Sequence, residues 1–237
     1  MTPMPYCGPA PVPDQLWRSW NLDPAVLIGL ALLTVWLMRS DQRGAGMLAV
    51  AALAVAFVSP LCALTVALFS ARAVHHLLLI AVAAPALAVA WPAMARVPAG
   101  LSLAALTGAM IAWHLPDLYA AIWASDGLYW LMQAAMLLPA WAFWSAVLAP
   151  RPTAPEALRR AGLIGGLAGV MGLLGAALTF APAILYVPHL GTTLPWGLPP
   201  LADQQLAGLI MWVPGFVPMA AIAALVLGRA WRAEVAR

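Results

Sequence analysis

Long apolar stretches recur along the chain and are separated by short polar connections. A helix needs roughly 20 mostly apolar residues to cross a bilayer, and a chain of 237 residues has room for about seven such stretches. The alternating pattern of a transmembrane β-barrel is absent, so each stretch can satisfy its backbone in lipid only as a helix. We therefore predict an all-α polytopic membrane bundle of seven helices. The predicted spans are residues 24–38, 45–67, 73–91, 100–115, 127–149, 161–185 and 204–228.

The composition agrees with a protein whose solvent is the lipid bilayer. Hydrophobic residues make up 65% of the chain and charged residues only 8%, whereas a soluble domain carries about 25% charged residues. Such a chain lacks the polar side chains to cover a surface that faces water. The net charge is +3 and there is no lysine, which argues against a nucleic-acid partner because nucleic acids require a dense basic patch.

The distribution of arginine predicts the orientation in the membrane, because connections on the cytoplasmic side carry an excess of positive charge. Arg18 and Arg72 fall on one predicted side. Nine fall on the other, namely Arg39, Arg43, Arg96, Arg151, Arg159, Arg160, Arg229, Arg232 and Arg237. We therefore expect the amino end outside and the carboxyl end in the cytoplasm. The predicted division is a periplasmic tail over 1–23, a membrane domain over 24–229 and a cytoplasmic tail over 230–237.

Glycine and proline positions predict how the helices pack. A strip of small residues in the sixth predicted span favours a tight seam with a neighbouring helix, because small residues let backbones approach closely in lipid. The strip consists of Gly162, Gly165, Gly166, Gly169, Gly172 and Gly175. Pro85, Pro139 and Pro214 lie inside predicted spans. Each proline frees backbone groups that neighbouring helices or waters must satisfy.

The four histidines all fall on the predicted outer side, which makes them the candidates for chemistry. They are His75, His76, His114 and His189, and ionisable residues in or near a bilayer are functional candidates by default. Imidazole is the commonest metal ligand and suits copper. Thiol and thioether sulfurs suit Cu(I). Cys62 is expected near the same side, as are Met132 and Met136, which lie one helical turn apart. A copper site at the outer ends of the helices is therefore chemically possible.

Each candidate also has a structural interpretation. Every histidine taken singly is as readily a packed or solvated residue as a ligand, and the methionines are more often packing residues. Cys7 and Cys62 are far apart in sequence, and we expect no disulfide framework. Arg72 shares a helix face with His76 and opposes a bound cation. We expect Asp203 to form an ion pair or network with Arg72 near the outer surface.

Several functional classes find no support. The chain has no nucleophile-elbow motif with a histidine and a carboxylate, no phosphate-binding loop and no HExxH motif, so we expect a protein that is not an enzyme. Neither an inverted repeat of broken helices nor a series of charged residues within the spans is evident, which disfavours a secondary transporter.

Four segments in order resemble a known family. In chain order they are Val58-Ser-Pro60-Leu, Phe69-Ser-Ala-Arg-Ala-Val-His-His76, Trp113-His-Leu-Pro116 with Leu118-Tyr119, and Asp203-Gln-Gln-Leu-Ala-Gly-Leu-Ile-Met-Trp212. Together they resemble the cytochrome c oxidase assembly factors of CtaG type, from the second predicted span to the seventh. The resemblance implies a seven-span protein of the bacterial inner membrane that helps assemble a caa3-type oxidase, with oxidase subunits as partners.

The resemblance also implies roles for particular residues. The histidines of the family correspond to His76 and His114, and its aspartate corresponds to Asp203. Arg72 stands where the family usually has its first histidine, and Met132 or Gln133 stands near an expected histidine in the fifth span. The leading hypothesis is an assembly factor that aids copper delivery or metal-centre maturation, with His189, Cys62 and Met132 as supporting ligands. One alternative is a haem- or quinone-binding electron-transfer protein with His76 and His114 as axial ligands. The other is a metal-free structural accessory subunit.

Overall fold

The computed structural model describes residues 4–150 and 152–235, and all regular structure in these ranges is helical. Arg151 and Arg237, which were counted on the predicted cytoplasmic side, lie outside the described residues. The helices are α1 (Pro24–Leu37), α2 (Arg43–Phe57), α3 (Pro60–Ala67), α4 (Phe69–Leu78), α5 (Ala84–Ala90), α6 (Ala99–Trp113), α7 (Pro116–Ala121), α8 (Asp126–Val147), α9 (Ala154–Thr179) and α10 (Pro200–Val235). Short 3₁₀ helices cover Pro13–Arg18, Ile122–Ala124, Val187–His189 and Leu194–Trp196, and a π-helical turn over Leu79–Ala83 joins α4 to α5.

Among the described residues, four helical segments are long and apolar enough to cross a membrane, and two bent pairs raise the number of candidate spans to six, against the seven predicted. The four are Phe69–Ala90, Asp126–Val147, Ala154–Thr179 and Pro200–Val235. The bent pairs are α2 with α3, which meet at 44°, and α6 with the segment Pro116–Ala124, which meet at 78°. The first predicted span corresponds to α1, whose 14 residues extend only about 21 Å at 1.5 Å per residue, short of the roughly 30 Å core of a bilayer.

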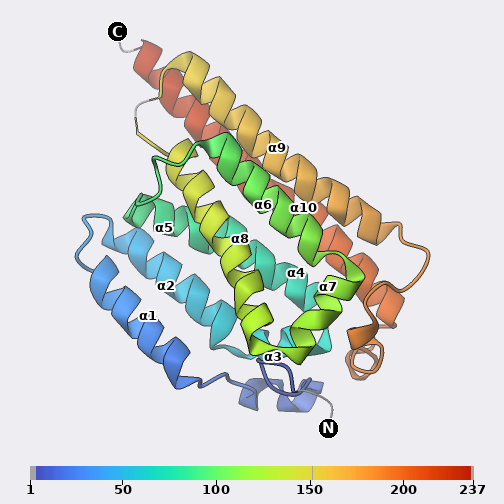
Figure 1. Cartoon of the computed structure of the whole chain (residues 1–237). Helices are drawn as coiled ribbons and strands as arrows, with labels where there is room; N and C mark the ends of the chain where they lie inside the picture. The colour runs from blue at the N-terminus through green and yellow to red at the C-terminus, as the bar shows by residue number, and fades with distance from the viewer. Residues whose placement is uncertain (1–3, 151, 236–237) are drawn as a thin grey trace.

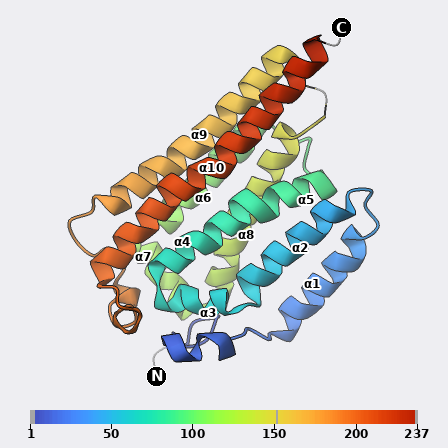
Figure 2. The same cartoon turned by 180° about the vertical axis from the view of Figure 1, so that it is seen from behind.

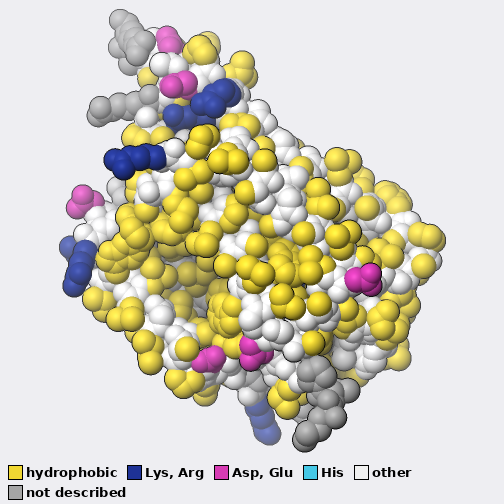
Figure 3. Space-filling model, viewed as in Figure 1, with side chains coloured by type: hydrophobic (Ala, Val, Ile, Leu, Met, Phe, Trp, Pro, Cys, Tyr) yellow, Lys and Arg dark blue, Asp and Glu magenta, His cyan; other side chains and the backbone are white. Residues whose placement is uncertain are grey.

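The helices form one elongated bundle, with α9 and α10 side by side along one flank and α1 outermost on the other (Figure 1, Figure 2). The first described residues lie at one end of the bundle and the last lie at the opposite end. Hydrophobic side chains cover much of the face in Figure 3, and the charged side chains on that face lie mainly towards its edges. Large apolar residues such as Leu32, Leu173 and Phe216 are exposed. Several candidate spans with such a surface indicate a multi-pass membrane protein.

Pro85 shows how a proline inside a span is accommodated. Because proline has no N–H, it cannot complete the π-type bond to the carbonyl five residues earlier, which is that of Ile80. The indole Nε1 of Trp144 in α8 donates to that carbonyl at 2.7 Å. The prediction that neighbouring helices satisfy the groups freed by proline is confirmed at this position, and the bond fixes α8 against the middle of the span Phe69–Ala90.

The glycine strip is only partly the tight seam that was predicted. The positions of Gly162, Gly165 and Gly169 have open space where a Cβ would be, and at Gly166 a Cβ would make only an ordinary contact with Leu103. The close approach is further along α9, at Gly175. A Cβ there would lie 2.6 Å from the carbonyl oxygen of Gly208 in α10. The seam therefore pairs one glycine of α9 with one of α10, and most of the strip is exposed.

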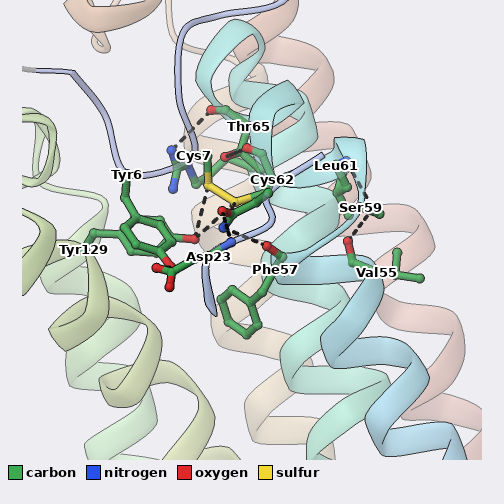
Figure 4. The surroundings of a disulfide bond; sticks show 12 residues. Tyr6, Cys7, Asp23, Val55, Phe57, Ser59, Leu61, Cys62, Thr65 and Tyr129 are labelled. Atoms are coloured by element: carbon green, nitrogen blue, oxygen red, sulfur yellow. Dashed lines mark hydrogen bonds between the residues drawn. A yellow bond between two sulfur atoms is a disulfide. The ribbon is translucent and has the colours of Figure 1, made fainter. Parts of the chain in front are cut away.

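The N-terminal tail is folded onto the bundle by a disulfide between Cys7 and Cys62, so the expectation that these cysteines are unpaired is wrong. Their sulfur atoms are 2.00 Å apart, and Figure 4 shows the bond beside Tyr6 and Tyr129. The ring of Tyr6 stacks on that of Tyr129 at 4.7 Å, and its hydroxyl donates to Asp23 at 2.5 Å. The large separation of the two cysteines in the sequence did not indicate this bond, because the tail turns back and crosses the start of α3.

Candidate metal centre

His76 and His114 line the same buried cavity, as the copper hypothesis requires. His76 lies on α4 and His114 directly follows the last residue of α6. The cavity has a volume of about 10 Å³, which is about the space that one water molecule needs. The two imidazoles therefore converge on a space for one small ligand.

Methionine side chains from four helices complete the lining of this cavity. They are Met110 in α6, Met136 in α8, Met171 in α9 and Met211 in α10. Each is buried, with an exposed fraction of 6% or less. With His76 on α4, five helices each contribute a histidine or a methionine to the lining of one cavity, which also includes Ala73, Leu77 and Ile80. We refer to these six residues as the His–Met cavity.

The hydrogen bonds around the histidines leave ring nitrogens available. Nδ1 of His114 lies 2.7 Å from the carbonyl oxygen of Met110. A carbonyl can only accept, so Nδ1 carries the proton and the lone pair of His114 is on Nε2. Nε2 of His76 is buried and has no hydrogen-bond partner among the described residues. A backbone carbonyl that holds the far nitrogen of an imidazole is the usual second-shell arrangement of a histidine metal ligand.

The donor set favours a soft monovalent cation. Neutral imidazole and thioether groups suit Cu(I), whereas carboxylate and carbonyl oxygens suit Mg²⁺ or Ca²⁺. No carboxylate lines the cavity. Within the described ranges, no cluster of three or more His, Cys, Asp or Glu side chains is arranged to hold a metal ion, so any metal at His76 and His114 would depend on the methionines.

The supporting ligands that were predicted lie elsewhere. Met132 is fully buried in α8 but does not line the cavity, and Met136, one turn further on, takes that place. Cys62 is in the disulfide, and a disulfide sulfur is not the thiolate that binds a metal. His75 is fully buried on another face of α4, with its ring edge-on to that of Phe57 at 5.3 Å between ring centres.

His189 belongs to a neighbouring polar cluster. Its Nε2 lies 2.7 Å from the hydroxyl of Tyr119, and its ring packs against Trp123 at 5.3 Å. Burial, and secondarily the positive charge of Arg72, lowers the pKa of His189 to about 3. The ring is therefore neutral at physiological pH, with its hydrogen bond directed to Tyr119 and not to the His–Met cavity.

The predicted Arg72–Asp203 ion pair is wrong. Both carboxylate oxygens of Asp203 bind the start of α4, where they accept from the backbone N–H groups of Phe69 and Ser70 and from the Ser70 hydroxyl. One nitrogen of Arg72 donates to the Thr65 carbonyl at 3.2 Å, and its guanidinium lies 5.7 Å from the centre of the Tyr119 ring. The carboxylate instead satisfies free N–H groups at a helix N-terminus, where negative charge is stabilised.

Comparison with known proteins identifies the family to which these elements belong. The family model of the cytochrome c oxidase caa3 assembly factor matches residues 97–233, which is more than half of the chain. The chain belongs to the caa3 oxidase assembly factor family. His114 and the four methionines of the cavity lie inside the matched range, whereas His76 and Arg72 precede it. No curated protein and no solved structure gives a match.

Family membership confirms the resemblance seen in the sequence and implies an oxidase as the partner. For two of the four cavity methionines, the sequence also carries a signal that could have placed them near the histidines. Met110 lies four residues before His114 and therefore on the same helix face, and Met211 is part of the Asp203–Trp212 segment that resembles the family. Met171 carries no such signal, because in the sequence it is one more apolar residue of a span.

Proposed function

We propose that this caa3 assembly factor holds Cu(I) in the His–Met cavity and passes it to an oxidase subunit from the outer side of the bacterial inner membrane. The observation that carries this proposal is the convergence of two imidazoles and four thioethers from five helices on one small cavity. Copper is the cargo here, and the residues that would hold it are neutral and soft. Thioethers bind Cu(I) through a single weak donor each, which suits a site that must release its ion.

The disulfide supports the proposed orientation. Disulfides persist in oxidising compartments such as the periplasm and are rare in the cytosol. Cys7 and Cys62 lie at the end of the bundle that the arginine distribution assigns to the outside. His114 is near that end as well, because it follows the helix that leads into the connection Pro116–Ala124.

The size of the cavity disfavours the haem or quinone alternative. Pockets for small organic molecules typically have volumes of about 300–1,000 Å³, against about 10 Å³ between His76 and His114. A porphyrin ring between these histidines would require the helices to separate. The metal-free accessory subunit remains the competing function, and copper binding distinguishes it from the proposal.

The experiment measures Cu(I) bound by the purified protein in competition with a chromogenic chelator, under a reductant that leaves disulfides intact. Met136→Leu removes one thioether and conserves volume, and Met132→Leu is its matched control one turn away on the same helix. We expect Met136→Leu and His114→Gln to weaken binding by about tenfold or more, and Met132→Leu to bind as the wild type does. Equal affinity in all four proteins would exclude the His–Met cavity as the site.

Assembly itself is tested separately in a strain that lacks this protein. We expect low caa3 oxidase activity in the deletion strain, restored by the wild type and by Met132→Leu but not by His114→Gln. Normal oxidase activity in the deletion strain would refute the assembly role. If His114→Gln fully restored the oxidase activity, the assembly role would stand but would not depend on copper binding in the His–Met cavity. That result would favour the accessory subunit.

A further inference from the structure

A second small cavity lies at the end of the bundle beneath the N-terminal tail, separate from the His–Met cavity. Its volume is also about 10 Å³. The tail covers it with Tyr6 and Cys7, and its other walls include Arg72 of α4, Trp123 and Tyr129. The disulfide holds the tail in this position (Figure 4). The cavity is therefore closed by a segment that is covalently tied to α3.

Unpartnered hydrogen-bond donors face this cavity. Arg72 is 3% exposed, and its Nε and Nη1 have no hydrogen-bond partner among the described residues. The indole Nε1 of Trp123 is also buried, and no residue within the described ranges makes a well-formed hydrogen bond to it. The Tyr119 hydroxyl is near both side chains but is paired with Nε2 of His189. Both side chains can only donate, since neither a guanidinium nor an indole N–H accepts a hydrogen bond.

Among the described residues, no carboxylate is hydrogen-bonded to the guanidinium. It is charged at all physiological pH values, and a buried charge without a partner is strongly destabilising. The nearest candidate on sequence grounds, Asp203, uses both oxygens at the start of α4. In the described part of the chain, the guanidinium donates to the Thr65 carbonyl and lies against Tyr119, and neither group carries a charge.

We propose that this cavity binds a small monovalent anion, with chloride as the occupant. A halide accepts hydrogen bonds from several donors at once and supplies the charge that Arg72 lacks, whereas a water molecule would satisfy the donors but leave the charge uncompensated. The volume admits a one-atom ion and excludes phosphate or sulfate. The site therefore consists of Arg72 and Trp123, closed by the tail that the disulfide secures.

An anion here has a consequence for the neighbouring cavity. Arg72 and His76 lie one helical turn apart on the same face of α4, so an uncompensated guanidinium disfavours a cation near His76. Chloride next to Arg72 would reduce that repulsion. The anion site itself rests on the unpartnered donors alone and stands whether or not the protein binds copper.

The test measures halide binding by the purified full-length protein without copper. The thermal midpoint of unfolding is followed while chloride or bromide replaces gluconate at constant ionic strength, with sulfate as an anion too large for the cavity. Specific binding to the folded state raises the midpoint in a saturable way. The variants are Arg72→Met, Trp123→Phe, and Arg18→Gln as the control, because Arg18 is exposed at the same end of the bundle.

We expect saturable stabilisation by chloride and bromide, but not by sulfate, in the wild type and in Arg18→Gln. Trp123→Phe removes one donor and should weaken the apparent halide affinity by about tenfold, as expected for a hydrogen bond to a charged partner. Arg72→Met should abolish the response. If Arg72→Met does not fold, Trp123→Phe and an anomalous bromide peak beside Arg72 in crystals decide the matter. No halide response in the wild type, or an equal response in Trp123→Phe and Arg18→Gln, would overturn the proposal.

Discussion

The contact between α9 and α10 at Gly175 is expected to control both stability and the geometry of the His–Met cavity. Gly175→Ala places a Cβ 2.6 Å from the carbonyl oxygen of Gly208 and 3.1 Å from the backbone nitrogen of Trp212. Ordinary van der Waals contact begins at 3.4 Å, so the helices would have to separate by about 0.8 Å. Backbone atoms cannot move aside as a flexible side chain can, and the whole seam must therefore shift.

The magnitude follows from comparison with a glycine that has open space. Inserting a methyl group into a packed interface typically costs about 1–3 kcal/mol, and replacing glycine by alanine inside a helix gains up to about 1 kcal/mol. Gly165→Ala receives the gain without the clash, because nothing lies within 4 Å of its Cβ position. The difference in unfolding free energy between Gly175→Ala and Gly165→Ala isolates the clash, and we expect about 1–3 kcal/mol.

Unfolding in detergent micelles, followed by tryptophan fluorescence, measures this difference. Cu(I) affinity provides a second readout, because Met171 lies one turn before Gly175 and Met211 lies three residues after Gly208. A shift of the seam should move both thioethers and lower the affinity, whereas Gly165→Ala should bind copper normally. If Gly175→Ala is as stable as Gly165→Ala, the close approach of the two helices is not real and the reasoning fails.

Two further predictions concern buried polar groups. Asp203→Asn replaces an acceptor of three hydrogen bonds at the start of α4 and should lower the unfolding free energy by about 1–3 kcal/mol. Asp117→Asn, at an exposed position in α7, should change the unfolding free energy little. Similar losses of stability in the two variants would contradict the role of Asp203 as a cap at the start of α4. Below pH 6.5 the unfolded chain protonates His189 while the folded protein, with a pKa of about 3, does not, so stability falls as the pH drops from 6.5 towards 3. We expect His189 to lower the unfolding free energy by about 2 kcal/mol at pH 5. The measurement is the difference in pH dependence of stability between the wild type and His189→Gln. Identical pH profiles of the two proteins would refute this prediction.

Hydrophobic patterning predicted the helical segments because lipid permits few alternatives for an apolar chain. Each predicted span corresponds to helical structure, although α1 is short and two spans are bent pairs. The bends follow Phe57 and Trp113, where Pro60 and Pro116 begin the next helix. Proline at the first position of a helix is favourable, so the sequence signal for these breaks was present.

The candidate site was predicted only in part. The four histidines were singled out because ionisable groups near lipid are costly, and the resemblance to the family then selected His76 and His114 among them. Met132 entered the predicted ligand set because it stands near a position where the family has a histidine in the fifth span. Met136 lines the cavity instead, and only the rotation of α8 determines which of the two reaches it. The disulfide could not be inferred from spacing, because it depends on how the tail crosses α3.

The sequence by itself determined the solvent of this protein, its helical class, its family and the two imidazoles, since these follow from residue chemistry and short-range pattern. The tertiary structure decided which methionines lie beside those imidazoles, where α9 and α10 touch, and that Asp203 binds the start of α4 and not Arg72. The physical reason is that apolar residues look alike along a span in lipid. Only the packing of five helices distinguishes a methionine that lines a cavity from one that fills the core.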